Sequence, residues 1–410
     1  MGREAKTCDV LIIGGGLAGA SLACALENSG LAVALIEAHP LHAETQPCYD
    51  DRTVALSYGS RVIFEAMGLW PAMADRIEAI KTIHISDRGH LGATRLRHLD
   101  EGVEALGYVA ENRVLGEVLY QRLAENQNVQ LHCPAHVLSL QQQDDSVQLR
   151  YAENGAEHEL SAGLVVVADG VSSATREMLQ IGTSRQDYQQ SAIITNVTPG
   201  QPHQNTAYER FTDTGPLAFL PMTAQRCSVV WTVPTGQVDA LLALDDDAFL
   251  EQLQQRFGYR LGRLRKVGQR QAYPLALVES TQLVRGRVVI VGNAAHAIHP
   301  VAGQGFNLAL RDVALLAELL SAQGDAPVEE MLASYQAMRT QDAQRVYRFT
   351  DTLVKIFSND FPPLAHARAA ALLLTDLMPA VKHRLARQSM GLSGRLSRLG
   401  RGLSMVKRNV

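Results

Sequence analysis

The chain has 410 residues, of which 46% are hydrophobic and 20% are charged. This length is enough for two or three domains with a sizeable core, and the composition is typical of a soluble globular enzyme rather than a disordered chain. The net charge of −4 argues against nonspecific binding of nucleic acid. No apolar run reaches the roughly 18 residues that a membrane-spanning helix needs.

The cysteines and the N-terminal segment exclude further classes. The five cysteines are Cys8, Cys24, Cys48, Cys133 and Cys227, and no two of them are spaced as CxxC. This argues against a disulfide framework and against a zinc site, so we predict no metal. The polar start, MGREAKTCDV, lacks the apolar core of a signal peptide, which predicts a cytoplasmic protein.

In chain order, the first clear unit is a strand, a turn, a helix and a second strand between residues 9 and 37. The apolar run DVLII predicts a buried parallel strand, and the turn after it carries Gly14, Gly16 and Gly19 in the pattern GxGxxG. These glycines permit a tight turn, close approach to a pyrophosphate and close packing of helix on strand. Glu37 ends the second strand, where a carboxylate can accept ribose hydroxyls. The unit predicts a dinucleotide site without separating FAD from NAD.

Two further strands each run into a glycine turn. Asp169 and Gly170 follow the apolar run 164–168, and Gly292 and Asn293 follow the run 288–291. Ligands of open α/β sheets lie at the carboxyl ends of the strands, so three such turns indicate one shared cofactor site. A plain NAD dehydrogenase needs only the first turn.

Short β-type runs dominate residues 185–280, and helical patterns dominate from about residue 305. Beyond Asp376 the chain has no acidic residue but eight basic ones: Lys382, Arg384, Arg387, Arg395, Arg398, Arg401, Lys407 and Arg408. A basic tail on an acidic body indicates an anionic partner or a membrane surface, so we expect peripheral association with the inner membrane face. A solvated, disordered tail is the alternative. The oligomeric state stays open, a homo-oligomer included.

The three turns together resemble the class A flavoprotein monooxygenases, the family of para-hydroxybenzoate hydroxylase, over about residues 8–375. The family's second motif corresponds to Asp169, Gly170, Ser173 and Arg176. Its third motif corresponds to Gly292, Asn293, Ala294, Ala295, His296, Pro300, Gly303, Gly305 and Asn307. The resemblance also implies that Arg52 and Arg113 approach the flavin, that Pro300 and Gln304 line its edge, and that the helix start at Gly305 and Phe306 faces it.

Asn293 departs from the family pattern, which has Asp after the glycine. The amide oxygen of Asn accepts the same hydrogen bond without the charge, so we expect FAD still to bind. The Asn, together with the segments HISDRGH, ERFTDTGPLAFLPM and YPLAL, resembles the ubiquinone-biosynthesis hydroxylases. Within them it is most similar to the 2-octaprenyl-6-methoxyphenol hydroxylase branch.

The resemblance implies an α/β fold with a three-layer Rossmann-like FAD-binding domain, an inserted antiparallel β-sheet substrate domain and a helical C-terminal part. We expect the FAD-binding domain over residues 1–184 and 281–330, with substrate-domain excursions at about 75–110. The substrate sheet is expected over 185–280, and a helical region with a basic tail over 331–410.

The implied reaction is hydroxylation of the ring of a polyprenyl phenol in ubiquinone biosynthesis. It would use FAD, NAD(P)H (NADPH in preference to NADH) and dioxygen, through a flavin C(4a)-hydroperoxide, because the cofactor performs the chemistry and the protein positions the ring. Predicted pocket residues are Tyr208, Phe219, Pro221, Met222 and Trp231. Phe219 and Trp231 are equally compatible with the core.

Several roles stay open at this point. His296 and His299 are more often structural than catalytic in this family, and Tyr208, Glu209 and water are all candidates for accepting the phenol proton. Expected partners are the polyprenyl phenol, dioxygen and a membrane surface or other ubiquinone-biosynthesis proteins, but no nucleic acid. The alternatives are a hydroxylase of a small soluble aromatic acid, a flavin-bound scaffold subunit, and a flavin-linked reductase.

Overall fold

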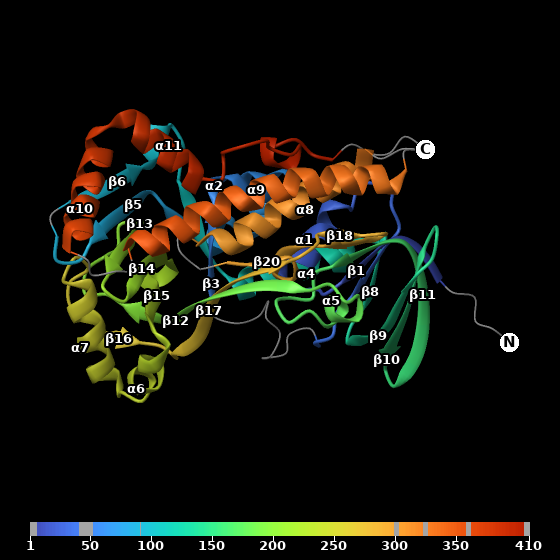
Figure 1. Cartoon of the computed structure of the whole chain (residues 1–410), viewed down its shortest axis with the longest axis horizontal. Coiled ribbons are helices and arrows are strands. Elements are labelled where there is room, and N and C mark those ends of the chain that lie inside the picture. The colour runs from blue at the N-terminus through green and yellow to red at the C-terminus, as the bar shows by residue number, and fades with distance from the viewer. Residues whose placement is uncertain are drawn as a thin grey trace.

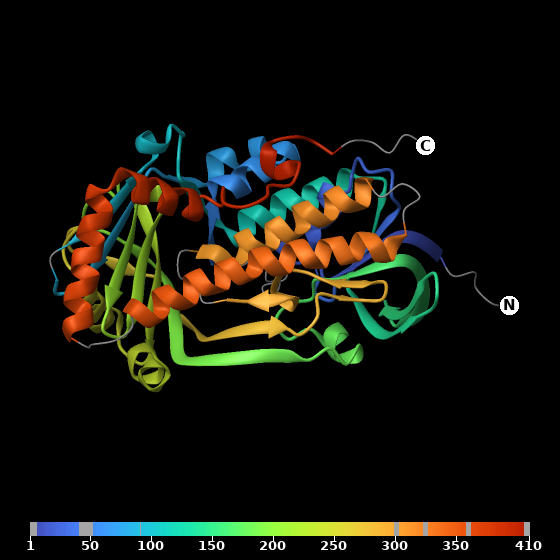
Figure 2. The same ribbon diagram turned by 45° about the horizontal axis from the view of Figure 1, so that its top comes forward.

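The computed structural model describes residues 6–40, 52–90, 92–298, 303–322, 327–357 and 362–405. Two large sheets lie toward opposite ends of an elongated molecule, and the long helices α8 (Gln304–Ala322) and α9 (Val328–Phe357) run side by side along its length (Figure 1). Figure 2 shows the same two helices across the front of the molecule.

The first sheet has a parallel core in the order β19-β11-β1-β2-β8. Its strands are β1 (Lys6–Ile13), β2 (Val33–Ile36), β8 (Val129–His132), β11 (Ala156–Val167) and β19 (Val288–Ile290). The edge strand β18 (Val284–Arg285) and the hairpin of β9 (Ala135–Gln142) and β10 (Val147–Glu153) join it antiparallel. The parallel core reads as continuous apolar runs because both of its faces are covered.

Helices cover one face of this sheet. Side chains of α1 (Leu17–Ala25), α4 (Asn112–Glu125) and α8 form one apolar cluster with β1 and β11. On the other face a second cluster includes residues of β9 and β10, and the short helix α5 (Ala174–Met178) follows β11 on the chain. This arrangement leaves the carboxyl ends of β1, β11 and β19 at one edge.

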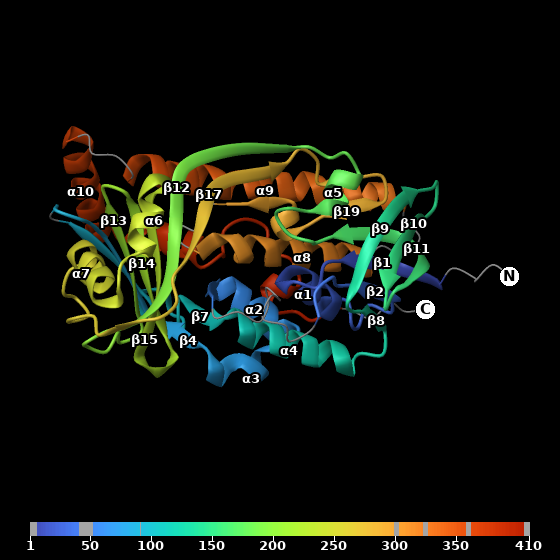
Figure 3. The ribbon, with the colours of Figure 1, turned by 90° about the horizontal axis from the view of Figure 1, so that it is seen from below.

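The second sheet follows the order β20-β17-β12-β15-β14-β13-β5-β6, with β16 beside β12. It is antiparallel except for the parallel pair of β13 and β5. The strands are β5 (Thr82–Asp87), β6 (Ala93–Arg97), β12 (Thr183–Thr198), β13 (Thr206–Thr212), β14 (Gly215–Met222), β15 (Arg226–Pro234), β16 (Lys266–Val267), β17 (Gln271–Ser280) and β20 (His296–Ala297). Figure 3 shows the long strands β12 and β17 extending from the end of the molecule that holds the first sheet into the second sheet.

Helices α6 (Val238–Leu242) and α7 (Asp246–Phe257) pack on one face of the second sheet. Between the two sheets lies a small third sheet of β3 (Thr53–Ser57), β7 (Gly107–Glu111) and β4 (Glu78–Ile80), with α2 (Tyr58–Ala66) and α3 (Trp70–Met73). Helices α10 (Pro362–Leu377) and α11 (Pro379–Ser389) come next. After α11 the chain folds back onto α2.

The predicted fold class, a Rossmann-like FAD-binding domain with an inserted β-sheet and C-terminal helices, is confirmed. The domain boundaries given above stay predictions. Within the C-terminal segment, Met390 and Leu399 are each 1% exposed, so these residues pack against the body of the protein. Within the described ranges, no helix has both the length and the apolar character to cross a bilayer.

Candidate functional site

The three predicted turns meet at one edge of the first sheet. The backbone N–H of Ala168 donates to the carbonyl of Ile13 at 2.7 Å, and that of Val291 donates to Val167 at 2.9 Å. These bonds place the ends of β1, β11 and β19 next to one another. The turns that follow the three strands are therefore neighbours in space although they are far apart in the sequence.

Two glycines of the first turn are required by its geometry. Gly14 has φ +101°, in the left-handed region that favours glycine. A Cβ atom at Gly19 would lie 1.9 Å from the carbonyl oxygen of Gly14, so no side chain fits there. Gly16, at the start of α1, faces open space instead. The turn thus holds the helix start close to the strand and leaves its free N–H groups accessible.

Glu37 lies beside this turn and is 5% exposed. Its Oε2 accepts the N–H of Gly15 at 2.5 Å and its Oε1 accepts that of His39 at 2.7 Å. A carboxylate has about four acceptor positions, so capacity for ribose hydroxyls is left. Tyr120 of α4, which sequence reasoning missed, donates its hydroxyl to the carbonyl of Gly15 at 2.7 Å. No local motif around Tyr120 signals this contact.

The second turn holds an acid with one unsatisfied oxygen. Oδ2 of Asp169 accepts the N–H of Thr175 at 3.1 Å, but its buried Oδ1 has no hydrogen-bond partner among the described residues. Ser173 caps α5 by accepting the N–H of Arg176 at 3.0 Å. The guanidinium of Arg176 donates to the carbonyl of Ala294 at 2.7 Å, which ties the second turn to the third.

The third turn continues into α8. Asn293 is exposed in a short 3-10 turn, η6 (Gly292–Ala294). Pro300 and His299 fall outside the described residues. Gln304 is 4% exposed, a Cβ at Gly305 would meet nothing within 4 Å, and the Phe306 ring stacks on that of Phe64 with centroids 6.3 Å apart. The N-terminus of α8 is therefore open on the Gly305 side.

Asn307 fixes this helix start. Its Oδ1 accepts the N–H of Ser57 at 2.8 Å and the hydroxyl of Ser60 at 2.7 Å. Its Nδ2 donates to the carbonyls of Ala55 at 2.8 Å and Gly303 at 2.6 Å. All hydrogen-bonding groups of the buried amide are used, so Asn307 binds β3 and α2 to the turn before α8.

The two arginines assigned to the flavin lie in different surroundings. The guanidinium of Arg52 lies 5.3 Å from the ring centroid of Tyr273 on β17, where the two large sheets approach each other. Arg113 lies at the exposed start of α4 and forms ion pairs with Glu117 at 3.2 Å and Glu111 at 3.3 Å. The roles of both stay predictions.

His296 lies in a buried charge network. Its Nε2 is 3.0 Å from Oδ2 of Asp312, whose Oδ1 accepts from Nε of Arg339 at 2.5 Å. His296 is 2% exposed and Asp312 1%. Arg339 also lowers the pKa of Asp312 against the opposing effect of burial. This position favours the structural role for His296.

The predicted pocket residues divide between the two faces of the second sheet. Phe219 is fully buried and stacks on Phe257 of α7 with centroids 3.8 Å apart, and Trp231 packs edge-on against Phe249 at 5.6 Å. These positions support the alternative that both are core residues. Tyr208 packs on the same face.

Pro221 is also buried, and it pairs with Cys227 on the neighbouring strand. Met222 points to the opposite face, where it joins a small cluster with Ile80 and Val109 of the third sheet.

The opposite face of the sheet presents a row that sequence reasoning did not assign to a pocket. Ile194, Glu209, Ala218 and Val230 are paired across β12, β13, β14 and β15, and all are partly buried. Side chains alternate between faces along a strand, so these residues point away from the α7 core. Burial raises the pKa of Glu209 from 4.5 to about 7, and no described residue hydrogen-bonds its carboxylate.

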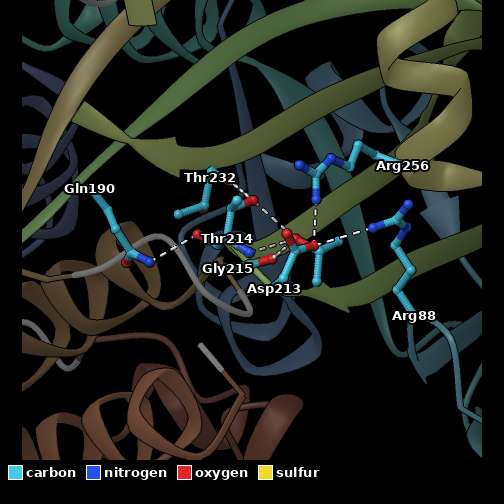
Figure 4. Close-up of polar contacts among 8 residues, drawn as sticks. Arg88, Gln190, Asp213, Thr214, Gly215, Thr232 and Arg256 are labelled. Atoms are coloured by element: carbon cyan, nitrogen blue, oxygen red, sulfur yellow. Dashed lines mark hydrogen bonds and ion pairs between the residues drawn. The ribbon is translucent and has the colours of Figure 1, made fainter. Parts of the chain in front are cut away.

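The hairpin that carries Glu209 is held at its turn (Figure 4). Asp213 binds Arg88 at 3.2 Å and also Arg256 of α7. The carbonyl of Thr214 accepts from Nε2 of Gln190 at 2.9 Å. These bonds tie β13 and β14 to α7 and β12, so the position of Glu209 is fixed by the frame of the sheet.

The three turns fit FAD. The unsatisfied Oδ1 of Asp169 is an acceptor that a buried hydroxyl would satisfy, because buried polar atoms rarely lack a partner. Gly16, Gly170 and Gly305, one from each turn, all face open space. The helix starts of α1 and α8 offer N–H groups to anionic groups of the cofactor. Among the described residues, no group of His, Cys, Asp or Glu is arranged to hold a metal ion.

Comparisons with known proteins agree with this geometry. A family model described as FAD binding domain matches residues 7–350. The chain is 38% identical to ubiquinone hydroxylase UbiL of Rhodospirillum rubrum, over 95% of this chain and 91% of that one. It is 31% identical to 3-demethoxyubiquinol 3-hydroxylase of Escherichia coli, over 94% and 98% of the two chains.

Among solved structures, p-nitrophenol 4-monooxygenase PnpA of Pseudomonas putida has the same fold, with a TM-score of 0.79 at 19% identity over 95% and 99% of the two chains. The resemblance drawn from the motifs is thus confirmed at the level of the family, whereas the 2-octaprenyl-6-methoxyphenol branch stays a prediction. The chain belongs to the FAD-binding-domain family of FAD-dependent aromatic monooxygenases.

Proposed function

We propose that the chain hydroxylates the aromatic ring of a polyprenyl phenol in ubiquinone biosynthesis. The observation that carries this proposal is the complete set of three cofactor turns in a chain whose full-length relatives are named ubiquinone hydroxylases. FAD, when bound, accepts hydride from a reduced nicotinamide and activates dioxygen. The chain itself binds the cofactor, positions the phenol and keeps water out.

The cofactor would be held at residues from all three turns. The N-terminus of α1 at Gly16 would bind the pyrophosphate, and Glu37 and Asp169 would accept hydroxyl groups of the ribose and ribityl chains. The N–H groups at Gly305 and Phe306 would stabilise negative charge on the reduced ring. Asn293 lies exposed beside these groups, where its amide oxygen can accept one further hydrogen bond.

The row of Ile194, Glu209, Ala218 and Val230 would form the pocket wall, and Glu209 is our candidate for the group that accepts the phenol proton. Its face of the sheet is not filled by α7, and its pKa of about 7 suits proton transfer near neutral pH. Tyr208 is less suited, because it packs on the α7 side and burial raises its pKa. Glu209→Gln should remove the acid limb near pH 7 from the kcat/KM profile.

For the hydride donor we propose NADPH in preference to NADH, as the class A resemblance implies. Comparing the two nucleotides in an assay of substrate-dependent oxidation, with dioxygen uptake recorded in parallel, tests this choice. Oxidation without dioxygen uptake would identify a reductase instead.

A prenyl chain requires contact with a membrane, because each buried CH₂ is worth about 0.8 kcal/mol. The junction of α10 and α11 exposes an apolar row: Leu373, Leu374, Leu377, Met378 and Val381. Basic side chains of α11, namely Lys382, Arg384 and Arg387, follow directly. Such a pattern suits an anionic bilayer surface, so we propose that this junction rests on the inner membrane face.

Co-sedimentation with anionic vesicles tests that contact. Leu374→Glu with Leu377→Glu should reduce the bound fraction, whereas Leu99→Glu, at an exposed leucine elsewhere, should leave it unchanged. Equal binding of both variants would contradict the assignment of this surface.

The reaction is tested by the quinone lipids of a strain that lacks the gene. Accumulation of a prenylated phenol, relieved by the natural chain but not by Gly14→Val, is the expected result, since the strained glycine turn admits no side chain. Full rescue by Gly14→Val would show a scaffold role without catalysis. Normal ubiquinone in the deletion strain would contradict the assignment to this pathway.

A further inference from the structure

A cavity of about 440 Å³ lies between α2, α8, α9 and the C-terminal segment 391–400. Its described lining includes none of the glycines and acids of the predicted flavin turns, so it is distinct from them. Its polar lining includes Arg311, Arg339, Asp342, Arg345 and Arg395.

The tail wall of this cavity is fixed by close backbone contact. The N–H of Gly59 in α2 donates to the carbonyl of Met390 at 2.8 Å. A Cβ atom at Gly391 would lie 2.9 Å from Oγ of Ser57, so Gly391 packs directly against the Ser57 side chain. Leu399, 1% exposed, anchors the end of the segment. The cavity is therefore a built feature of the fold.

Two arginines of the lining, Arg311 and Arg339, share two acids, Asp312 and Asp342. Arg339 pairs with Asp312 and Asp342, whereas Arg311 pairs, within the described part of the chain, with Asp342 alone, at 3.3 Å. Asp312 also lies beside His296. The side chain of Arg311 is 15% exposed, yet its buried Nε has no hydrogen-bond partner among the residues that the structure describes. Burial lowers the pKa of Arg311, as expected for a cation that is incompletely neutralised.

Two more arginines lie at the mouth. Arg345 of α9 and Arg395 of the tail are exposed, and within the described residues neither has an ion pair with an acid. Asp342 is the one acidic residue in the described part of the lining, so this part carries a clear excess of positive charge. Guanidinium groups bind phosphate and carboxylate oxygens through paired N–H donors.

The apolar part of the lining consists of Ile63, Leu315, Met338 and Leu396, and serines, glycines and Gln341 complete it. A cavity of this size takes a small organic molecule rather than a bare ion. We propose that the cavity binds a phosphate ester, with the phosphate against the four arginines and the organic body against the apolar wall. The same chemistry is offered by a soluble nucleotide and by a phospholipid headgroup.

A ligand bound in this cavity would affect the predicted cofactor site. Ser57 and Ser60 line the cavity, and the N–H of Ser57 and the hydroxyl of Ser60 also donate to Oδ1 of Asn307. The Nδ2 of Asn307 in turn donates to the carbonyl of Gly303 at 2.6 Å. A ligand that orders the start of α2 therefore stabilises the turn before α8. We expect flavin release to slow when the cavity is filled.

Isothermal titration of the FAD-loaded protein tests the proposal, since the flavin turns are then occupied. The probes are AMP for the soluble source and dihexanoyl phosphatidate, below its micelle concentration, for the lipid source. We expect at least one probe to bind and adenosine not to bind. Tighter binding of AMP would identify a nucleotide as the ligand, and tighter binding of the phosphatidate would identify a lipid.

Arg345→Gln and Arg395→Gln should each weaken binding about tenfold, the loss of one charged hydrogen bond. Both side chains are exposed and lack acidic partners, so the variants should fold. Arg348→Gln, an exposed arginine of α9 outside the cavity, is the matched control and should bind as the natural protein does. The proposal is overturned if neither probe binds the natural protein at low salt, or if all three variants behave alike.

Discussion

The raised pKa of Glu209 predicts how the free energy of unfolding changes with pH, whatever the role of this residue in catalysis. Burial raises its pKa from 4.5 to about 7, so the folded protein favours the protonated form. The cost of ionising it is absent below pH 4.5, grows as the pH rises, and is complete above pH 7. At 1.36 kcal/mol per pKa unit, the cost increases by about 2.5 kcal/mol between pH 5 and pH 8.

Glu209→Gln removes this cost. The stability gain of the variant over the natural protein should therefore grow by about 2.5 kcal/mol from pH 5 to pH 8. Urea unfolding of both proteins at several pH values measures this difference. Glu251→Gln, at an exposed position of α7, is the control and should show no such trend. A difference for Glu209→Gln that stays level across the range would refute the argument from burial.

Three further predictions concern the cofactor turns and the charge network. Gly19→Ala should abolish flavin binding, since the new Cβ would lie 1.9 Å from the carbonyl oxygen of Gly14. The control Gly236→Ala, at a glycine that faces open space, should retain the flavin absorbance. Equal flavin content in the two purified variants would contradict this prediction. Asn293→Asp should change flavin affinity by less than about tenfold, because the acceptor is retained; a complete loss on titration would oppose it. Asp312→Asn should cost about 3–5 kcal/mol in urea unfolding, because it removes the buried carboxylate that pairs with Arg339 and lies beside His296; a loss below about 1 kcal/mol would contradict it.

The cofactor domain was predictable because its signals are local. Each turn follows an apolar run of a few residues, and the positions that admit only glycine, such as Gly14 and Gly19, are recorded in the sequence itself. Long-range partners left no such record. Tyr120 contacts the first turn from α4, and Ser57 with Ser60 fixes Asn307 from a segment about 250 residues away.

The substrate side shows where local patterns fail. Alternation along β13, β14 and β15 separates Phe219 and Trp231 from Glu209 and Val230, but it does not say which set faces the cofactor. That choice depends on the side on which α7 packs, which is a tertiary contact. The largest aromatic residues therefore went to the core, whereas smaller and charged residues occupy the open face.

The strand order of the first sheet also dictates when the protein can acquire its flavin. The central strand β1 leaves the ribosome first, but its neighbour β11 ends at residue 167 and β19 begins only at residue 288. At translation rates of about 5–20 residues per second, roughly 15–60 s separate the synthesis of the first turn from that of the third. During this interval the nascent chain lacks the partners of its apolar strands, and unpaired strand edges are prone to aggregation. The complete cofactor site therefore exists only after the third turn has been made, and we expect chains arrested before residue 290 not to retain flavin.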